Sequence, residues 1–440
     1  MFKYLFLLSA VALATPVSAQ FAAETQDDEP LERTIEHLDD SITVTATGLG
    51  IDVTGTGQAI TVIGETEIVS IQGADIARVL TRAPAVSLVR NGPLGSFTGL
   101  SVRGAASEQL LVLIDGVRVA DQASPSGGFD FGTLLATNIA SLDLLRGANS
   151  TIWGADALGG VLDVSTRGRA GLRASLEYGA RDTVTAAASG AVEGEGYLFG
   201  LGGTALRSDG FSAAASGTEA DGLRQWAIGG SAFVDVTDTL ELSVRARYTE
   251  GDLEIDGFPA PAFALADTLE TQHTRQYSGA IGANYLGQDL TLRASYNLSD
   301  TERENVDPAL GPIFASNGHT DSLTLRGEYR AIGGLTLAFG GEHQWSSYET
   351  SFDERQSARI TGGYLQAGWV LGGLAAHVGA RVDDHEFFGS EVSFGGDVSY
   401  AIGGGWRVKG SVGEGFKAPT LFQLFSDYGN EALRPERSTS

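Results

Sequence analysis

The sequence of 440 residues contains no cysteine, which excludes both a disulfide framework and a catalytic thiol. Basic residues are scarce, because 29 lysines and arginines stand against 55 acidic residues and leave a formal net charge of −26. Nucleic acids need a basic surface for their phosphates, so this balance excludes a nucleic-acid partner. Beyond the N-terminal segment no run of about 18 apolar residues occurs, so a position in a membrane would require a β-barrel.

Motifs for catalysis are missing as well. The six histidines form neither a His-x-x-x-His nor a His-Glu-x-x-His spacing, which are the zinc-binding motifs found on helices. No Gly-x-Ser-x-Gly elbow of a serine hydrolase occurs either. The glycine-rich stretches match neither the phosphate-binding loop nor the dinucleotide fingerprint. We therefore expect no enzymatic activity and no catalytic cofactor.

Glycine is abundant instead, with 60 residues, and from about residue 169 onward apolar and polar residues alternate. The alternation is clear in residues 240–248, 290–297 and 323–330. It is typical of antiparallel strands that have one face in an apolar and one in a polar environment. We count about 13 such strands of about ten residues, the length that crosses the hydrocarbon core in a barrel. A soluble β-sandwich would show the same alternation.

The connections between these strands favour a transmembrane barrel over a sandwich. Tight turns are predicted near residues 193–196, 237–239, 287–288, 333–334, 372–373 and 403–405. We interpret the polar stretches between them as long loops, near residues 207–221, 250–273, 299–320, 346–357 and 383–391. Short turns at one end and long loops at the other are typical of outer-membrane barrels. Aromatic residues near strand ends, as in the girdles of such barrels, are Tyr178, Tyr248, Trp345 and Trp406.

The N-terminus predicts export. Residues 1–19 combine the basic Lys3, an apolar segment and small residues at Val17-Ser18-Ala19, as a cleaved signal peptide does. Residues 20–47 start with an acidic segment that we expect to be disordered. They end in a stretch with β-branched residues, which favours an extended strand able to pair with a partner's sheet edge. This stretch consists of Asp40, Ser41, Ile42, Thr43, Val44, Thr45 and Ala46.

Residues 48–168 predict a compact α/β domain. Residues 110–119 indicate a buried strand that ends in a turn at Asp115-Gly116. In residues 142–167, closely spaced glycines allow positive φ and close packing against a neighbouring wall. The arginines and acids here are expected to pair or cap within a small sheet rather than to bind a ligand. The residues that we expect to hold the domain together are Arg103, Gly104, Asp115, Gly116, Arg146, Gly147, Gly154, Gly159 and Gly160.

Several motifs of this domain resemble the plug domain of TonB-dependent outer-membrane receptors. They are Arg146-Gly147, Trp153-Gly154, Asp156-Ala157, Gly159-Gly160-Val161 and Thr166-Arg167. Residues 40–46 resemble the TonB box of this family, and residues 415–421 and 428–436 resemble a motif inside the barrel of its vitamin B12 (cobalamin) receptors.

The resemblance implies an N-terminal α/β plug domain at residues 48–168 and an all-β transmembrane barrel of antiparallel strands at residues 169–440. Family barrels have about 22 strands, of which about 13 are counted here. An open barrel would leave unpaired backbone groups in lipid. We therefore expect a C-terminally truncated fragment of the barrel.

The resemblance also implies a function. Members take up scarce large solutes across the outer membrane, with energy from the proton-motive force delivered by TonB and its inner-membrane complex. Cobalamin is the expected solute, and a ferric siderophore is the alternative within the family. A passive porin would lack the box and the plug, and a secreted hydrolase would need a catalytic set that is missing. We expect a monomer surrounded by outer-membrane lipid.

Two groups of residues are candidates for binding. Glycine-rich plug loops without periodicity are predicted to contact the solute, although plain connectors would look the same. Their candidate residues are Asn91, Leu94, Ser96, Phe97, Asp121, Gln122 and Ser124. Acidic residues of the outer loops offer the hard oxygen ligands that Ca²⁺ prefers, as in the cobalamin receptors, and a solvated loop without metal is the alternative. These acidic residues are Glu219, Asp221, Asp252, Glu254 and Asp256.

Overall fold

The computed structural model describes residues 42–43, 51–52, 55–73, 75–125, 127–136, 138–166 and 170–440. The predicted signal peptide and acidic leader lie outside these residues, and so do Asp40, Ser41, Val44, Thr45 and Ala46 of the predicted TonB box. Within the described part of the chain, no helix is long and apolar enough to cross a membrane.

A five-stranded sheet forms the centre of the plug domain, in the order β3, β8, β9, β6, β7. Its strands are β3 (Ala59–Gly64), β6 (Leu110–Ile114), β7 (Val117–Arg118), β8 (Ser141–Arg146) and β9 (Gly160–Ser165). β6 runs parallel to β9 and is buried along its length, which explains its continuous run of apolar residues. The predicted turn follows it, because Asp115 and Gly116 both have the positive φ that a two-residue hairpin requires.

The two faces of this sheet are covered by different partners. Helices α1 (Glu65–Ile71) and α2 (Ile76–Leu80) cover one face, where Ile68 and Leu80 are buried with Leu162. On the other face, α3 (Ser150–Trp153) places Trp153 in a cluster with Tyr364 of the large sheet. The remaining short elements are β1 (Ile42–Thr43), β2 (Ile51–Asp52), β4 (Val86–Arg90), β5 (Thr98–Val102) and the 3-10 helices Ser107–Gln109, Phe131–Thr133 and Ile332–Gly334.

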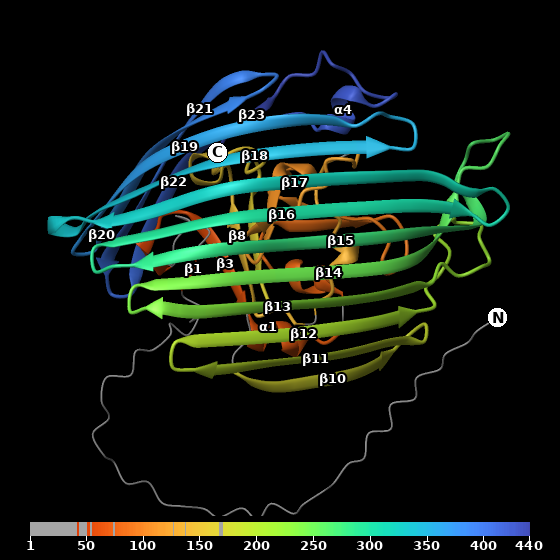
Figure 1. Ribbon diagram of the computed structural model, residues 1–440, viewed down its shortest axis with the longest axis horizontal. Coiled ribbons are helices and arrows are strands. Elements are labelled where there is room, and N and C mark those ends of the chain that lie inside the picture. Colours follow the sequence, from red (N-terminus) through yellow and green to blue (C-terminus); the bar gives the residue numbers. More distant parts are fainter. Residues whose placement is uncertain are drawn as a thin grey trace, which may run out of the picture. The chain divides into compact units, whose positions relative to one another are not determined.

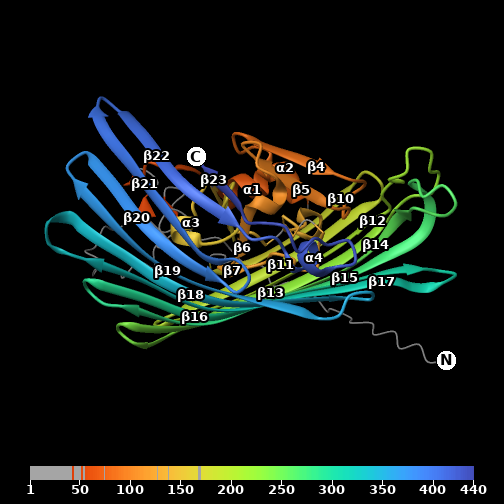
Figure 2. The ribbon, with the colours of Figure 1, turned by 90° about the horizontal axis from the view of Figure 1, so that it is seen from above.

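A fourteen-stranded antiparallel sheet follows the plug, and its strands lie side by side in chain order (Figures 1 and 2). The thirteen strands β10 to β22 agree with the number predicted from the alternation, and a short β23 joins them. The strands are β10 (Gly171–Gly179), β11 (Thr183–Gly194), β12 (Tyr197–Ser208), β13 (Leu223–Thr237), β14 (Leu240–Gly257), β15 (Ala266–Leu286), β16 (Leu290–Asp307), β17 (Gly311–Arg330), β18 (Leu335–Thr350), β19 (Gln356–Leu371), β20 (Leu374–His385), β21 (Gly389–Gly403), β22 (Trp406–Lys417) and β23 (Glu436–Thr439).

The alternation of apolar and polar residues in the sequence corresponds to the two faces of this sheet. On β13, Trp226 and Ile228 are 43% and 44% exposed on the outer face, whereas Gln225, between Arg224 and Trp226, is 5% exposed and donates to Thr133 of the plug. Trp226 lies against Tyr248 and Tyr248 against Tyr277, with ring centroids 5.0 and 5.4 Å apart across three neighbouring strands. An aromatic row of this kind is typical of a barrel at the membrane interface.

Two of the predicted long loops are strands. β14 pairs with β15 as far as Gly257 and Ala266, and β16 pairs with β17 as far as Asp307 and Gly311. The stretches 250–273 and 299–320 are therefore mostly extended hairpins, because backbone pairing continues where polar side chains replace apolar ones. We call the end of the sheet that carries these hairpins and the connections 209–222 and 418–435 the long-loop end.

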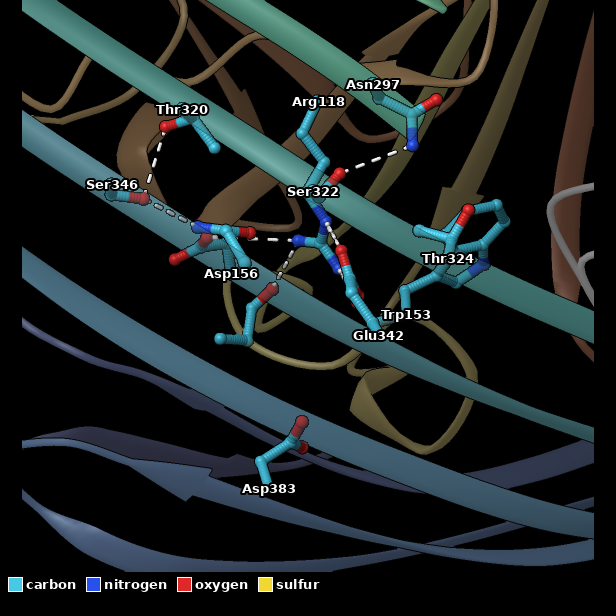
Figure 3. Close-up of polar contacts among 12 residues, drawn as sticks. Arg118, Trp153, Asp156, Asn297, Thr320, Ser322, Thr324, Glu342, Ser346 and Asp383 are labelled. Carbon is cyan, nitrogen blue, oxygen red and sulfur yellow. Dashed lines mark hydrogen bonds and ion pairs between the residues drawn. The ribbon is translucent and has the colours of Figure 1, made fainter. Parts of the chain in front are cut away.

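Buried charges link the plug to the large sheet (Figure 3). The guanidinium of Arg118 on β7 donates from Nε and Nη2 to the two carboxylate oxygens of Glu342 on β18, at 2.9 and 3.1 Å. Arg118 also donates to the carbonyl oxygens of Ala155 (3.0 Å) and Trp153. A bidentate pair of this kind fixes both distance and orientation. It therefore sets the position of the plug edge against β18.

Further charges of the wall complete this group. Arg381 on β20 has a nitrogen 3.6 Å from Glu342 and 2.7 Å from Asp383. The guanidinium carbon of Arg326 lies 3.8 Å from the ring centroid of Trp153, a cation–π contact between β17 and the plug. Glu342 thus lies between a plug arginine and a wall arginine, and each buried charge has an opposite charge within reach.

Replacing Glu342 by glutamine should weaken the attachment of the plug. Arg118 and Arg381 would then lack their shared counter-charge in a buried place, which typically costs about 3–5 kcal/mol. Hydrogen exchange of plug amides in increasing urea, followed by mass spectrometry, should show opening at a lower urea concentration. Glu328→Gln is the matched control, because its partner Arg330 is exposed and such pairs contribute below about 1 kcal/mol. Equal opening of the two variants would contradict the role given to Glu342.

Candidate functional site

The first predicted plug loop lies at the long-loop end of the sheet. It connects β4 to β5, and the Asn91 amide closes it by donating to the Phe97 carbonyl oxygen at 3.1 Å. Leu94 packs against Leu223 and Leu253, which belong to β13 and β14 near that end. The Ser96 amide donates to Pro93, and Phe97 is 37% exposed. The loop is therefore held by its own hydrogen bonds and by one apolar anchor.

The second predicted loop lies under a different part of the wall. Asp121 is buried and accepts from Arg303 of β16 at 3.2 Å and from the Ala123 amide at 2.9 Å. Ser124 is buried beside it. Gln122 lines a small polar cavity of about 50 Å³ together with Asp156 and Lys417. Leu94 of the first loop and Gln122 of the second thus line separate cavities.

Helix α4 (Leu421–Phe425) covers the second loop. It lies in the long connection between β22 and β23, and Gln423 donates to the Pro125 carbonyl oxygen at 3.2 Å. Leu421 is buried with Ala123 and Tyr348, and Phe422 and Phe425 pack against this cluster. Residues 415–421 and 428–436, which carried the resemblance to cobalamin receptors, surround this helix. The sequence alone did not predict that the helix between them covers the plug loop at residues 121–125.

A larger cavity of about 520 Å³ lies beside the first loop. Its lining includes the arginines Arg78, Arg90 and Arg181, the aromatic residues Tyr178 and Phe211, and Leu94 of the loop. Arg90 is bound to Asp75 at 2.7 Å, and the guanidinium carbon of Arg181 lies 4.6 Å from the ring centroid of Phe211. The lining next to the plug loop therefore combines three arginines and two aromatic rings with two acids, Asp75 and Glu177.

The basic and aromatic character of this cavity was missed in the sequence. Neither predicted loop contains an arginine or a tyrosine, because the side chains come from α2, β4 and the connections after β10 and β12. Arg90 directly precedes the loop at Asn91, and this was the one local signal that could have indicated it. The other side chains are brought in by the pairing of distant strands.

Three of the five predicted calcium ligands lie close together. Carboxylate oxygens of Glu219, Asp221 and Asp256 are within 4.8 Å of one another. Asp221 is 1% exposed, and its Oδ2 accepts from the Ala213 amide at 2.6 Å, whereas its buried Oδ1 has no hydrogen-bond partner. Asp256 accepts from the amides of Ala214 and Thr268 at 2.5 and 3.1 Å.

The other two predicted ligands have different partners. Glu254 accepts from the Gly222 amide at 2.8 Å and borders the cluster. Asp252 lies 2.6 Å from Nδ1 of His273 on the neighbouring β15 and is not part of the cluster. Alternation along β14 does put the three acids on one face, but only Glu254 and Asp256 reach the connection 209–222, and only Asp256 joins the cluster. The expected five-ligand set is therefore corrected to three carboxylates.

The protonation behaviour of the cluster follows from burial and crowding. Burial raises the pKa of Asp221 to about 6 against the lowering hydrogen bond from Ala213, and Asp256 adds to the rise. Burial also raises the pKa of Glu219, with further contributions from Asp267 and Asp221. Crowding makes it unfavourable for all three carboxylates to be ionised at once, and a shared cation would stabilise their charged forms. The donor set of hard oxygens with one unpartnered buried atom fits Ca²⁺.

The residues expected to hold the plug together lie within it. Asp115 accepts from the backbone amide and hydroxyl of Thr166 at 2.8 and 2.6 Å. Arg146 donates to the Pro84 carbonyl oxygen, and Arg103 to that of Arg146. Gly104, Gly116, Gly147, Gly154 and Gly160 have positive φ, and Gly159 does not. At Gly160 a Cβ would lie 2.3 Å from the Leu145 carbonyl oxygen, so only glycine fits this crossing of β8 and β9.

Comparisons with known proteins agree with this architecture. The family model "TonB-dependent Receptor Plug Domain" matches residues 52–161, and "TonB dependent receptor-like, beta-barrel" matches residues 300–440. The chain is 29% identical to the vitamin B12 transporter BtuB of Photobacterium profundum over 387 residues, which are 84% of this chain and 61% of that protein. The chain thus spans about three fifths of the length of this curated relative.

Solved structures share the fold. The siderophore receptor PirA of Acinetobacter baumannii superposes with a TM-score of 0.70 at 16% identity, covering 86% of this chain and 67% of that one. The ferric enterobactin receptor PfeA of Pseudomonas aeruginosa, in complex with enterobactin, gives a TM-score of 0.69 at 18% identity, with coverage of 87% and 68%. Family models for both domains, the curated relative and the shared fold lead to one conclusion. The chain belongs to the TonB-dependent receptors, a family of outer-membrane β-barrel proteins.

Proposed function

We propose that the protein takes up a scarce, large solute across the outer membrane by TonB-coupled active transport, and that this solute is cobalamin. The observation that carries the proposal is a plug held inside a transmembrane sheet by buried ion pairs, with the plug loop at residues 91–97 near the long-loop end. In this function the long-loop end faces the outside and the solute binds above the plug. The similarity to the vitamin B12 transporter BtuB supports the choice of cobalamin.

The coupling step uses residues 40–46. In the described part of this stretch, Ile42 and Thr43 pair antiparallel with Asp52 and Ile51. This extended backbone is the geometry that strand addition to a partner's sheet edge requires. TonB would bind the stretch in this way and pull it, using the proton-motive force. Displacement of the plug then opens a path for the solute.

A ferric siderophore is the second candidate. The cavity beside residues 91–97 supports it, because Arg78 and Arg181 offer positive charge to an anionic chelate. Aromatic surface from Tyr178 and Phe211 would pack against planar groups of such a ligand. Cobalamin needs instead a wide, mixed surface of polar and apolar groups.

A cobalamin auxotroph that lacks its own receptor should grow on trace cobalamin when it carries this receptor. Val44→Pro should abolish growth but leave binding of cyanocobalamin to whole cells intact, because proline removes a ladder donor from the box strand. Growth yield and bound radiolabelled cyanocobalamin are the two measurements.

Asp28→Pro, in the acidic leader ahead of the box, is the matched control and should grow normally. Normal growth of Val44→Pro at equal receptor levels would refute coupling through residues 40–46. Failure of the wild type on cobalamin, together with uptake of a ferric siderophore that is lost in Arg181→Gln, would assign the solute to the second candidate.

We also propose that Glu219, Asp221 and Asp256 bind Ca²⁺. The unpartnered Oδ1 of Asp221 supports this, because a buried carboxylate oxygen without a donor is costly. Bound Ca²⁺ would tie the connection 209–222 to the end of β14. Water and backbone oxygens would complete its six to eight ligands.

Calcium should raise the melting temperature of the receptor only above about pH 6. The reason is that the raised pKa of Asp221 keeps it protonated below that pH, and a protonated carboxyl does not bind the cation. Asp221→Asn should abolish the calcium-dependent shift. Asp252→Asn should retain it, because Asp252 pairs with His273 outside the cluster. Thermal melts with calcium or chelator at pH 5 and 7.5 test this, and equal shifts in both variants would exclude the site.

A further inference from the structure

A cavity of about 270 Å³ lies between the plug and the inner face of β10 to β13, and we call it the seam cavity. On the plug side it is bordered by α1 and by residues 135–140. On the wall side, glycine and alanine residues such as Gly200, Gly229 and Ala187 leave space where larger side chains would fill it. Its volume is sufficient for a small ion with its water or for one functional group of a larger solute.

The one cationic side chain of β14 that lines the seam cavity is Arg247. Its neighbours across the sheet are Gly229 on β13 and Ser278 on β15, both small. Among the described residues, Arg247 makes no hydrogen bond or ion pair, in contrast to Arg245, which donates to the Asp115 carbonyl oxygen at 3.3 Å. Five N–H donors of Arg247 are thus available inside a confined space.

The carboxylate that acts electrostatically on Arg247 already has other partners. The carboxylate of Asp115 acts on Arg247 across space, but both its oxygens accept from Thr166. A half-buried guanidinium without a counter-charge in contact is unfavourable, and an anion that enters the cavity would remove this cost. The planar fork of arginine matches carboxylate and phosphate groups.

The two ends of the seam cavity are closed by weak contacts. Glu65 at the start of α1 pairs with Arg173 at 2.8 Å, and the Gly73 amide after α1 donates to Glu177 at 2.9 Å. Both barrel partners belong to β10, and the side chain of Arg173 is 47% exposed. Such exposed pairs contribute little, whereas Arg118 and Glu342 on the opposite side of the plug are buried. At the seam cavity, Asn138 of the plug donates to the Gly203 carbonyl oxygen at 3.0 Å and to the Thr204 hydroxyl at 3.1 Å, so hydrogen bonds also hold the plug to the wall here.

We propose that Arg247 forms an anion-binding subsite in the seam cavity, for a carboxylate, phosphate or sulfate group. Two sources can supply this group: an inorganic anion, or an acidic group of the transported solute as it passes along the seam. The second source rests on the proposed transport function, whereas anion binding by itself does not. In either case the guanidinium provides the charge and the small residues of the wall provide the room.

Equilibrium dialysis with radiolabelled inorganic phosphate tests the subsite on the detergent-solubilised receptor. Arg247→Gln should weaken phosphate binding about tenfold or more, the expected effect of losing a charge-assisted bidentate contact. Arg247→Lys, which keeps the charge but loses the fork, should bind with intermediate strength and guards against a folding defect. Arg275→Gln removes the same charge from the outer face of β15, where Arg275 pairs with Glu302, and should bind as the wild type does. Equal binding by Arg247→Gln and wild type overturns the proposal.

Uptake measurements identify the source of the anion. Cyanocobalamin contains a phosphodiester and cobinamide lacks it, so Arg247→Gln should slow uptake of the former several-fold and leave that of the latter unchanged. Surface binding of both compounds should stay the same. If Arg247→Gln loses phosphate binding while both uptake rates stay normal, the subsite holds an inorganic anion. The idea that the solute passes over Arg247 would then be wrong. Lack of any cobalamin uptake by the wild type would count against the proposed solute, while the phosphate result would still decide the subsite.

Discussion

The position of the plug depends on charges that are buried between it and the wall. Glu342 lies between Arg118 of the plug and Arg381 of β20, and its two oxygens receive the fork of Arg118. In a low dielectric, such a group is tolerated only while each charge keeps its partner. A displaced plug would leave Glu342 with Arg381 alone. This ion-pair group therefore resists displacement of the plug.

The opposite side of the plug is held differently. Around the seam cavity the contacts include the exposed pair of Glu65 and Arg173, the hydrogen bond accepted by Glu177, and those that Asn138 donates to β12. The side chains of β11 to β13 that line this cavity are mostly small, whereas on the side of the ion pairs Trp153 of the plug packs in one cluster with Tyr364 of the wall. The attachment of the plug is therefore asymmetric, with buried ion pairs on one side and mainly hydrogen bonds on the other.

Local patterns in the sequence predicted much of this architecture. The Asp115-Gly116 turn, the buried strand before it and the thirteen alternating strands all depend on neighbours in the chain, and the structure confirms them. The prediction of a long loop at residues 250–273 was wrong, because a row of acids at every second position was interpreted as a loop. Strand pairing does not require apolar residues, so the hairpins of β14 to β17 extend beyond the apolar part.

By itself, the sequence determined the hairpin order, the α/β plug and the family, since these follow from periodicity, turn residues and short motifs. Only the tertiary structure decided which distant side chains meet. It separated Asp252 from Asp256, although both lie on one face of the same strand, because the connection 209–222 reaches only the end of β14. It also brought Arg78 and Arg181 to one cavity and left Arg247 unpartnered in another. These outcomes depend on how a curved sheet places its strands against the plug, a non-local property that no window of the sequence contains.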